Sequence, residues 1–156
     1  IITNANISYH TGALQVVGVS NIRIEVESTG NPVTPKAITS SEWKNINDEL
    51  KYRLVQFESL KVVGGKDDDN TDAYTIYAET PDGVRVNIRI DSNVALKVTG
   101  IMKNKTWETF KDMTFTNVTG VIQPYYEDYQ LMVMSLELIV VELFCKVLKM
   151  ILMQMV

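Results

Sequence analysis

The stretch that decides the fold runs over residues 74–91, YTIYAETPDGVRVNIRID. At its centre Pro81 presets the first dihedral of a tight turn, and Gly83 tolerates the positive φ that closes it. Beyond the turn, residues 84–91 alternate, with apolar side chains at the even positions and polar or charged ones at the odd positions. Alternation with a period of two is typical of a strand with one buried face, so this stretch predicts a β-hairpin.

Further strands are predicted on both sides of this hairpin, because β-branched and aromatic residues recur there between glycine, proline and asparagine. Residues 7–26 are expected to form two or three short strands. A long strand is expected from residue 52 to the glycines at 64 and 65. Two more are expected over residues 113–122, ending near Pro124, and over residues 129–134.

One helix is predicted over residues 40–50. Thr39 stands three residues before Glu42, which is the spacing of a capping box. Trp43, Ile46 and Leu50 follow at helical spacing, so we expect a helix of about three turns whose apolar side packs against the sheet.

The beginning of the chain is repeated near its end. With an offset of 115 residues, Ile7 corresponds to Ile122, and a set of side chains recurs without gaps. The matched positions are Ile7, Gln15, Val16, Ser20 and Ile24 on Ile122, Gln130, Leu131, Ser135 and Ile139. We therefore expect residues 1–34 to contain the terminal hairpin of a preceding unit, residues 35–141 to form a complete unit, and residues 142–156 to form an apolar tail.

Composition excludes several classes of function. The chain has 156 residues and a formal net charge of −4, which is the wrong sign for a protein that mainly binds polyphosphate. Cys145 is the single cysteine and His10 the single histidine. An intramolecular disulfide, a thiolate metal cluster and a histidine-rich metal site are therefore excluded. We expect no metal, no cofactor and no enzymatic activity, and we interpret His10 as a surface turn residue.

The last 21 residues differ from the rest of the chain, because sixteen of them are apolar. Four charged residues are spread through this stretch, whereas a membrane span needs roughly 20 mostly apolar residues. We therefore expect no membrane span. The tail predicts self-association instead, with contacts to a second subunit through Leu138, Val141, Phe144 and Leu148.

Several fragments, in their order along the chain, resemble a known pattern. They are Ile38-Thr39 with Trp43, Leu54-Val-Gln-Phe-Glu58, Tyr74-Thr-Ile-Tyr77, Pro81 to Asp91, Val118-Thr-Gly-Val-Ile122 and Tyr129-Gln-Leu-Met132. Together they are similar to the OB-fold modules that lie beside catalytic domains in secreted and surface-anchored bacterial nucleases and phosphoesterases. The resemblance covers residues 35–141 and implies an all-β fold, a five-stranded Greek-key barrel with one short helix. It also implies an extracellular or cell-surface location and an outer face that binds single-stranded nucleic acid or another extended polymer.

Two groups of side chains are candidate binding sites. Arg85 and Arg89 share one face of a predicted strand, and Tyr77 lies on the facing strand, so a base or phosphate could bind between them. The alternative is an ordinary solvated sheet face. The second group is the one basic stretch with an interleaved aromatic, and its candidate residues are Lys103, Lys105 and Trp107. In an OB barrel this connection lies near the ligand, although Trp107 could equally cap the end of the barrel.

The acidic tract that begins at Asp67 does not match a calcium-binding loop. Counting from Asp67, Asp72 and Ala78 stand where an EF-hand has glycine and glutamate, so we interpret the tract as a solvated turn.

Two function classes follow. The first is a non-catalytic binding module of a larger extracellular protein, with neighbouring domains and single-stranded nucleic acid or another polymer as its expected partners. The second is a structural or interaction module that forms homo-oligomers through residues 7–26 and the apolar tail.

Overall fold

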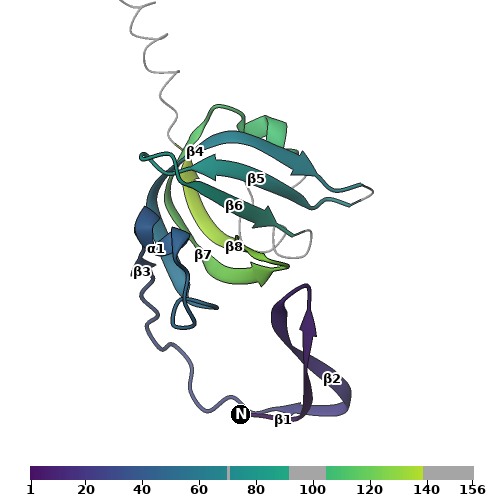
Figure 1. The fold of residues 1–156 in the computed structure, drawn as a ribbon. Helices are drawn as coiled ribbons and strands as arrows, with labels where there is room; N and C mark the ends of the chain where they lie inside the picture. The colour runs from purple at the N-terminus through teal and green to yellow at the C-terminus, as the bar shows by residue number, and fades with distance from the viewer. Residues whose placement is uncertain (70, 92–104, 139–156) are drawn as a thin grey trace, which may run out of the picture.

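The structure is a computed structural model that describes residues 1–69, 71–91 and 105–138 (Figure 1). Its elements in chain order are β1 (Ile2–His10), β2 (Ala13–Ile24), β3 (Lys36–Ala37), α1 (Ser40–Lys44), β4 (Leu54–Asp67), β5 (Tyr74–Glu79), β6 (Arg85–Ile90), the 3₁₀ turn η2 (Trp107–Phe110), β7 (Thr114–Tyr125) and β8 (Asp128–Leu138). The apolar tail expected over residues 142–156 lies outside the described residues.

Five strands close into a barrel, which confirms the predicted fold class. The order around the barrel is β4, β5, β6, β8 and β7, and β7 pairs again with β4. Neighbouring strands are antiparallel except β6 and β8, which run parallel with Ile88 opposite Leu131. This mixed order is that of an OB-fold, in which the fourth and fifth strands form a hairpin that closes the three-stranded meander before it.

The core fills the inside of this barrel. Buried and partly buried side chains alternate along β5, and β6 continues the same alternation. Ile76, Ile88 and Leu131 have no exposed surface, as expected for side chains that point inward from three neighbouring strands. The apolar alternation of residues 84–91 therefore marks the inner face of β6, and its polar positions lie on the outer face.

The turn predicted from Pro81 and Gly83 is confirmed. Gly83 has a φ of 78°, in the left-handed region that favours glycine. The amide of Thr80 donates to the carbonyl of Val84 at 2.9 Å, and the Thr80 hydroxyl donates to the Asp82 carboxylate at 2.7 Å. These bonds set the register in which β5 and β6 pair.

Several observed strand ends differ from the predicted ones, and the strand predicted over residues 129–134 continues to Leu138. The long strand β4 does not end at Gly64 but continues to Asp67, with a register shift against β5 between Val62 and Gly64. Such a bulge absorbs one extra residue and bends the strand around the barrel. Likewise β7 passes through Pro124 and ends at Tyr125. Pairing with neighbouring strands therefore continues past glycine and proline, which disfavour strands locally.

The predicted helix is shorter than expected. Thr39 does form the capping box with Glu42, but α1 ends at Lys44 instead of extending to Leu50. Trp43 and Leu50 are nevertheless buried in the core, because the turns that follow α1 still cover one end of the barrel. The indole N–H of Trp43 donates to the carbonyl of Arg85 at 3.0 Å, which ties this end to β6.

The hairpin predicted near the N-terminus is present as two long strands, β1 and β2, which form a separate two-stranded sheet (Figure 1). Its turn lies against the turn between β7 and β8. The carbonyl of Thr11 accepts a hydrogen bond from the amide of Tyr126, and the amide of Leu14 donates to the phenol oxygen of Tyr52 at 2.7 Å. The turn of the hairpin therefore extends one side of the barrel.

Candidate functional site

A groove of about 510 Å³ lies on the outer face of the barrel, and the turn of the β1–β2 hairpin forms part of its rim. In OB-folds the corresponding face, formed by the second and third strands and the loops beside them, binds extended ligands. Here those strands are β5 and β6, and β8 completes the floor. The lining residues are His10, Thr11, Gln15, Lys66, Asp68, Thr75, Tyr77, Asn87, Arg89, Asp91, Gln123, Tyr125, Asp128, Tyr129, Gln130 and Met132.

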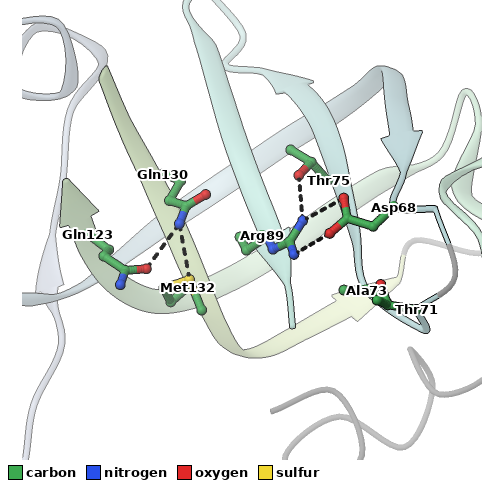
Figure 2. Close-up of polar contacts among 8 residues, drawn as sticks. All are labelled: Asp68, Thr71, Ala73, Thr75, Arg89, Gln123, Gln130 and Met132. Carbon is green, nitrogen blue, oxygen red and sulfur yellow. Dashed lines mark hydrogen bonds and ion pairs between the residues drawn. The ribbon is translucent and has the colours of Figure 1, made fainter. Parts of the chain in front are cut away.

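Arg89 lies in this groove and is held by a carboxylate. Its two terminal nitrogens donate to the two oxygens of Asp68 at 3.0 and 2.6 Å, and one of them also lies 3.4 Å from the hydroxyl of Thr75 (Figure 2). This bidentate bond lowers the pKa of Asp68 and raises that of Arg89. The guanidinium is therefore fixed in orientation, and its positive charge is largely compensated inside the protein.

The other end of the groove is formed by two amide side chains. The Nε2 group of Gln130 donates to Oε1 of Gln123 at 3.0 Å, across the β7–β8 pair, and lies 3.7 Å from the sulfur of Met132 (Figure 2). Because each amide carries both a donor and an acceptor, this pair retains hydrogen-bonding capacity toward the groove.

Described residues on either side of position 70 accept hydrogen bonds from backbone amides. The hydroxyl of Thr71 accepts from the amide of Ala73 at 3.2 Å, and Asp67 accepts from the amide of Trp107 at 3.0 Å. No group of three or more His, Cys, Asp or Glu that could hold a metal ion occurs within the described ranges. Asp67 and Asp68 thus have protein partners in this structure.

The structure brings Tyr77 and Arg85 together. The guanidinium carbon of Arg85 lies 3.9 Å from the centre of the Tyr77 ring, and its Nε donates to Asn87 at 3.3 Å. Asn87 in turn donates to Asp128 at 3.3 Å. One face of the Tyr77 ring is therefore covered by Arg85. The two arginines share the outer face of β6, as predicted, but each already has partners within the protein.

The described residues of the second candidate group, Lys105 and Trp107, lie outside the groove. Lys103 falls outside the described residues, and Lys105 is exposed. Trp107 is half-buried and packs against the core cluster, next to Gly65 on β4. Neither Lys105 nor Trp107 lines the groove, so Trp107 has the position expected of a residue that caps the barrel.

Of the predicted contacts with another subunit, one side chain is described. Leu138 is partly buried against the core of its own barrel. Val141, Phe144 and Leu148 lie outside the described residues. No helix in the described part of the chain is long and apolar enough to cross a membrane.

Most of the groove could not be predicted from the sequence. His10 comes from the β1–β2 hairpin and Gln123, Tyr125 and Gln130 come from the β7–β8 hairpin, and these two hairpins meet β5 and β6 only in the folded chain. One signal was present: Gln15 and Gln130 are matched by the 115-residue offset, and both line the groove. Their recurrence marks equivalent positions of two hairpins.

Fold and groove together define a five-stranded OB-type barrel with a polar outer groove. Comparison with protein-family models, curated proteins and solved structures gave no match.

Proposed function

We propose that this chain is a non-catalytic binding module that holds an extended polymer across the outer face of β5, β6 and β8. The observation that supports this proposal is the polar groove, in which Asn87, Arg89 and Gln130 are held in place by hydrogen bonds to other side chains. Preorganised hydrogen-bonding groups bind a ligand at a lower entropic cost than mobile ones. In line with the family resemblance, the module would hold the polymer near a catalytic domain of a larger extracellular protein.

The charge of the groove favours an uncharged, hydroxyl-bearing polymer over a polyphosphate. Two basic side chains, Lys66 and Arg89, line the groove together with three acidic ones, Asp68, Asp91 and Asp128. Because Asp68 compensates Arg89, little positive charge is left for phosphate oxygens, whereas amides and phenols suit sugar hydroxyls. Single-stranded nucleic acid is therefore the competing ligand in the test.

The test compares neutral oligosaccharides with single-stranded oligonucleotides at two salt concentrations, by isothermal titration calorimetry. We expect oligosaccharide binding that is independent of salt. Asp68→Asn releases Arg89, so it should weaken oligosaccharide binding and leave any oligonucleotide binding stronger and more salt-dependent. Asp69→Asn is the matched control, because it removes the same charge from an exposed position in the same loop that does not line the groove.

Two results would contradict the proposal. If neither ligand binds at millimolar concentration, the groove is not a polymer site. If oligonucleotides bind, and Arg85→Ala with Arg89→Ala weakens that binding and flattens its salt dependence, the ligand is nucleic acid. The non-catalytic part is tested separately: the chain with Mg²⁺ or Ca²⁺ is expected to leave oligonucleotides and oligosaccharides uncleaved over the same incubation.

A second candidate function is an interaction module, and a specific observation favours it. The hairpin β1–β2 exposes several large apolar side chains, among them Ile7 and Tyr9, which are 70% and 77% exposed. A cluster of this kind on a two-stranded sheet is typical of a surface that contacts another protein segment.

A further inference from the structure

The hairpin β1–β2 repeats the hairpin β7–β8 in register. Ile7 lies opposite Val16, and at the 115-residue offset Ile122 lies opposite Leu131. The same correspondence holds for each neighbouring pair from Ala5 opposite Gly18 to His10 opposite Ala13. These pairs match Gly120 opposite Val133 through Tyr125 opposite Asp128. The sequence repeat at an offset of 115 residues is therefore also a repeat of strand pairing.

The turns also correspond at their first residue. Each hairpin closes with a two-residue turn whose first residue has a positive φ, 49° at Thr11 and 54° at Tyr126. Farther from the turn the two hairpins differ: the register of β1 and β2 changes between Thr3 and Ala5, whereas that of β7 and β8 shifts at Thr119 and returns at Gly120 to the register it has at Thr116. The correspondence therefore covers the turn and the six residue pairs next to it.

The two hairpins differ in what covers them. Ile122 and Leu131 point into the barrel and have no exposed surface. Their counterparts Ile7 and Val16 are 70% and 57% exposed. Cross-strand neighbours lie on one face of a sheet, so Ile7, Tyr9, Leu14 and Val16 form one apolar face, which we call the apolar hairpin face. It is equivalent to the buried inner face of β7–β8.

We propose that the apolar hairpin face binds a three-stranded β-meander of the same kind as β4–β5–β6, so that β1 and β2 become the closing strands of a second OB-type barrel. In the barrel described above, β7 pairs with β4 and β8 pairs with β6, while their inner face is covered by core side chains. Within the described residues, β1 and β2 pair only with each other. A meander would cover the apolar side chains and also pair with both free edges, whereas face-to-face packing of two hairpins would leave the edges unpaired.

The test supplies such a meander in the correct register. Residues 35–115 are joined directly to Ile1 of the full chain, which restores the spacing that this segment has before Thr116. We expect the added segment to fold with β1–β2 into a second barrel. Hydrogen exchange measured by mass spectrometry should show the amides of β1 and β2 slowed by about 100-fold or more relative to the unextended chain.

Matched variants locate the contact. Ile7→Asp places a charge on the apolar hairpin face and should abolish the added protection, because an unpaired charge would be buried in the second barrel. Asn6→Asp places the same charge on the opposite face of β1, where the side chain is exposed, and should preserve the protection. Both variants should leave the exchange of β8 and of β7 from Thr116 onward unchanged, because these residues occur only once in the extended chain.

Two outcomes would overturn the proposal. One is an added segment that stays unfolded while β1–β2 exchanges as it does in the unextended chain. The other comes from sedimentation velocity of the 156-residue chain over a hundredfold range of concentration. A dimer that Ile7→Asp dissociates and Asn6→Asp does not would assign the face to a second copy of the chain.

Discussion

Gly64 and Gly65 lie next to each other in β4, beside its bulge, but only Gly65 lacks space for a larger side chain. A Cβ atom added to Gly65 would lie 2.4 Å from Cγ and 2.5 Å from Cβ of Trp107, and 2.7 Å from the carbonyl oxygen of Thr75. A Cβ added to Gly64 would meet its nearest atom, on the Tyr77 ring, at 3.5 Å, which is an ordinary van der Waals contact. Gly65→Ala and Gly64→Ala thus differ in one respect, the space available.

We expect Gly65→Ala to destabilise the barrel by about 1–3 kcal/mol, the usual cost of overpacking, because both Trp107 and the β5 backbone must move. Gly64→Ala should be neutral or stabilising by up to about 1 kcal/mol, since alanine restricts the unfolded chain more than glycine does. For a domain of this size each kcal/mol corresponds to roughly 4–8 °C in the melting temperature.

The measurement is urea unfolding followed by circular dichroism and by tryptophan fluorescence, with thermal melts as a second readout. Because Trp107 is displaced, its emission should change in folded Gly65→Ala and stay constant in Gly64→Ala. Equal stability of the two variants, within about 0.5 kcal/mol, would refute the argument that Trp107 requires glycine at position 65.

Three further predictions concern the start of the barrel domain. Thr39→Ala removes the cap of α1 and should cost about 1 kcal/mol in urea unfolding, whereas Thr39→Ser should restore most of it. Trp43→Phe removes the hydrogen bond to the Arg85 carbonyl and should cost about 0.5–1.5 kcal/mol, and an unchanged unfolding midpoint would contradict that bond. Hydrogen bonds from Lys36 and Thr39 lower the pKa of Glu42 to about 2, below its unfolded value, so its stabilising contribution is present above pH ~4.3 and is lost as the pH falls toward 2. Glu42→Gln should therefore flatten the dependence of the unfolding free energy on pH over that range, and a profile identical to that of the parent chain would reject this interpretation.

The sequence alone was sufficient to predict local structure where the residues that determine it lie within one short segment. The turn at Gly83 needs a positive φ, and the cap at Thr39 needs a carboxylate three residues later, so both could be predicted without knowing the fold. The end of the helix at Lys44 could not be predicted in this way. Apolar residues at helical spacing can also be buried by turns that cover the end of the barrel, as they are here. The ends of β4 and β7 were misjudged for a related reason: pairing with neighbouring strands stabilises a strand through Gly64 and Pro124 by more than those residues destabilise it.

The sequence by itself determined the all-β class, the β5–β6 hairpin, its inner and outer faces and the repeat at an offset of 115 residues, because these depend on periodicity and turn chemistry within short stretches. Only the tertiary structure decided what the outer face contains. Arg89 is bound to Asp68 from a loop some twenty residues away, and Gln130 meets Gln123 across a strand pair. It also decided that Ile7 is exposed while its counterpart Ile122 is buried. The two residues have the same side chain in the same local pairing, so the difference comes from the three strands that surround one hairpin and are absent around the other within the described residues.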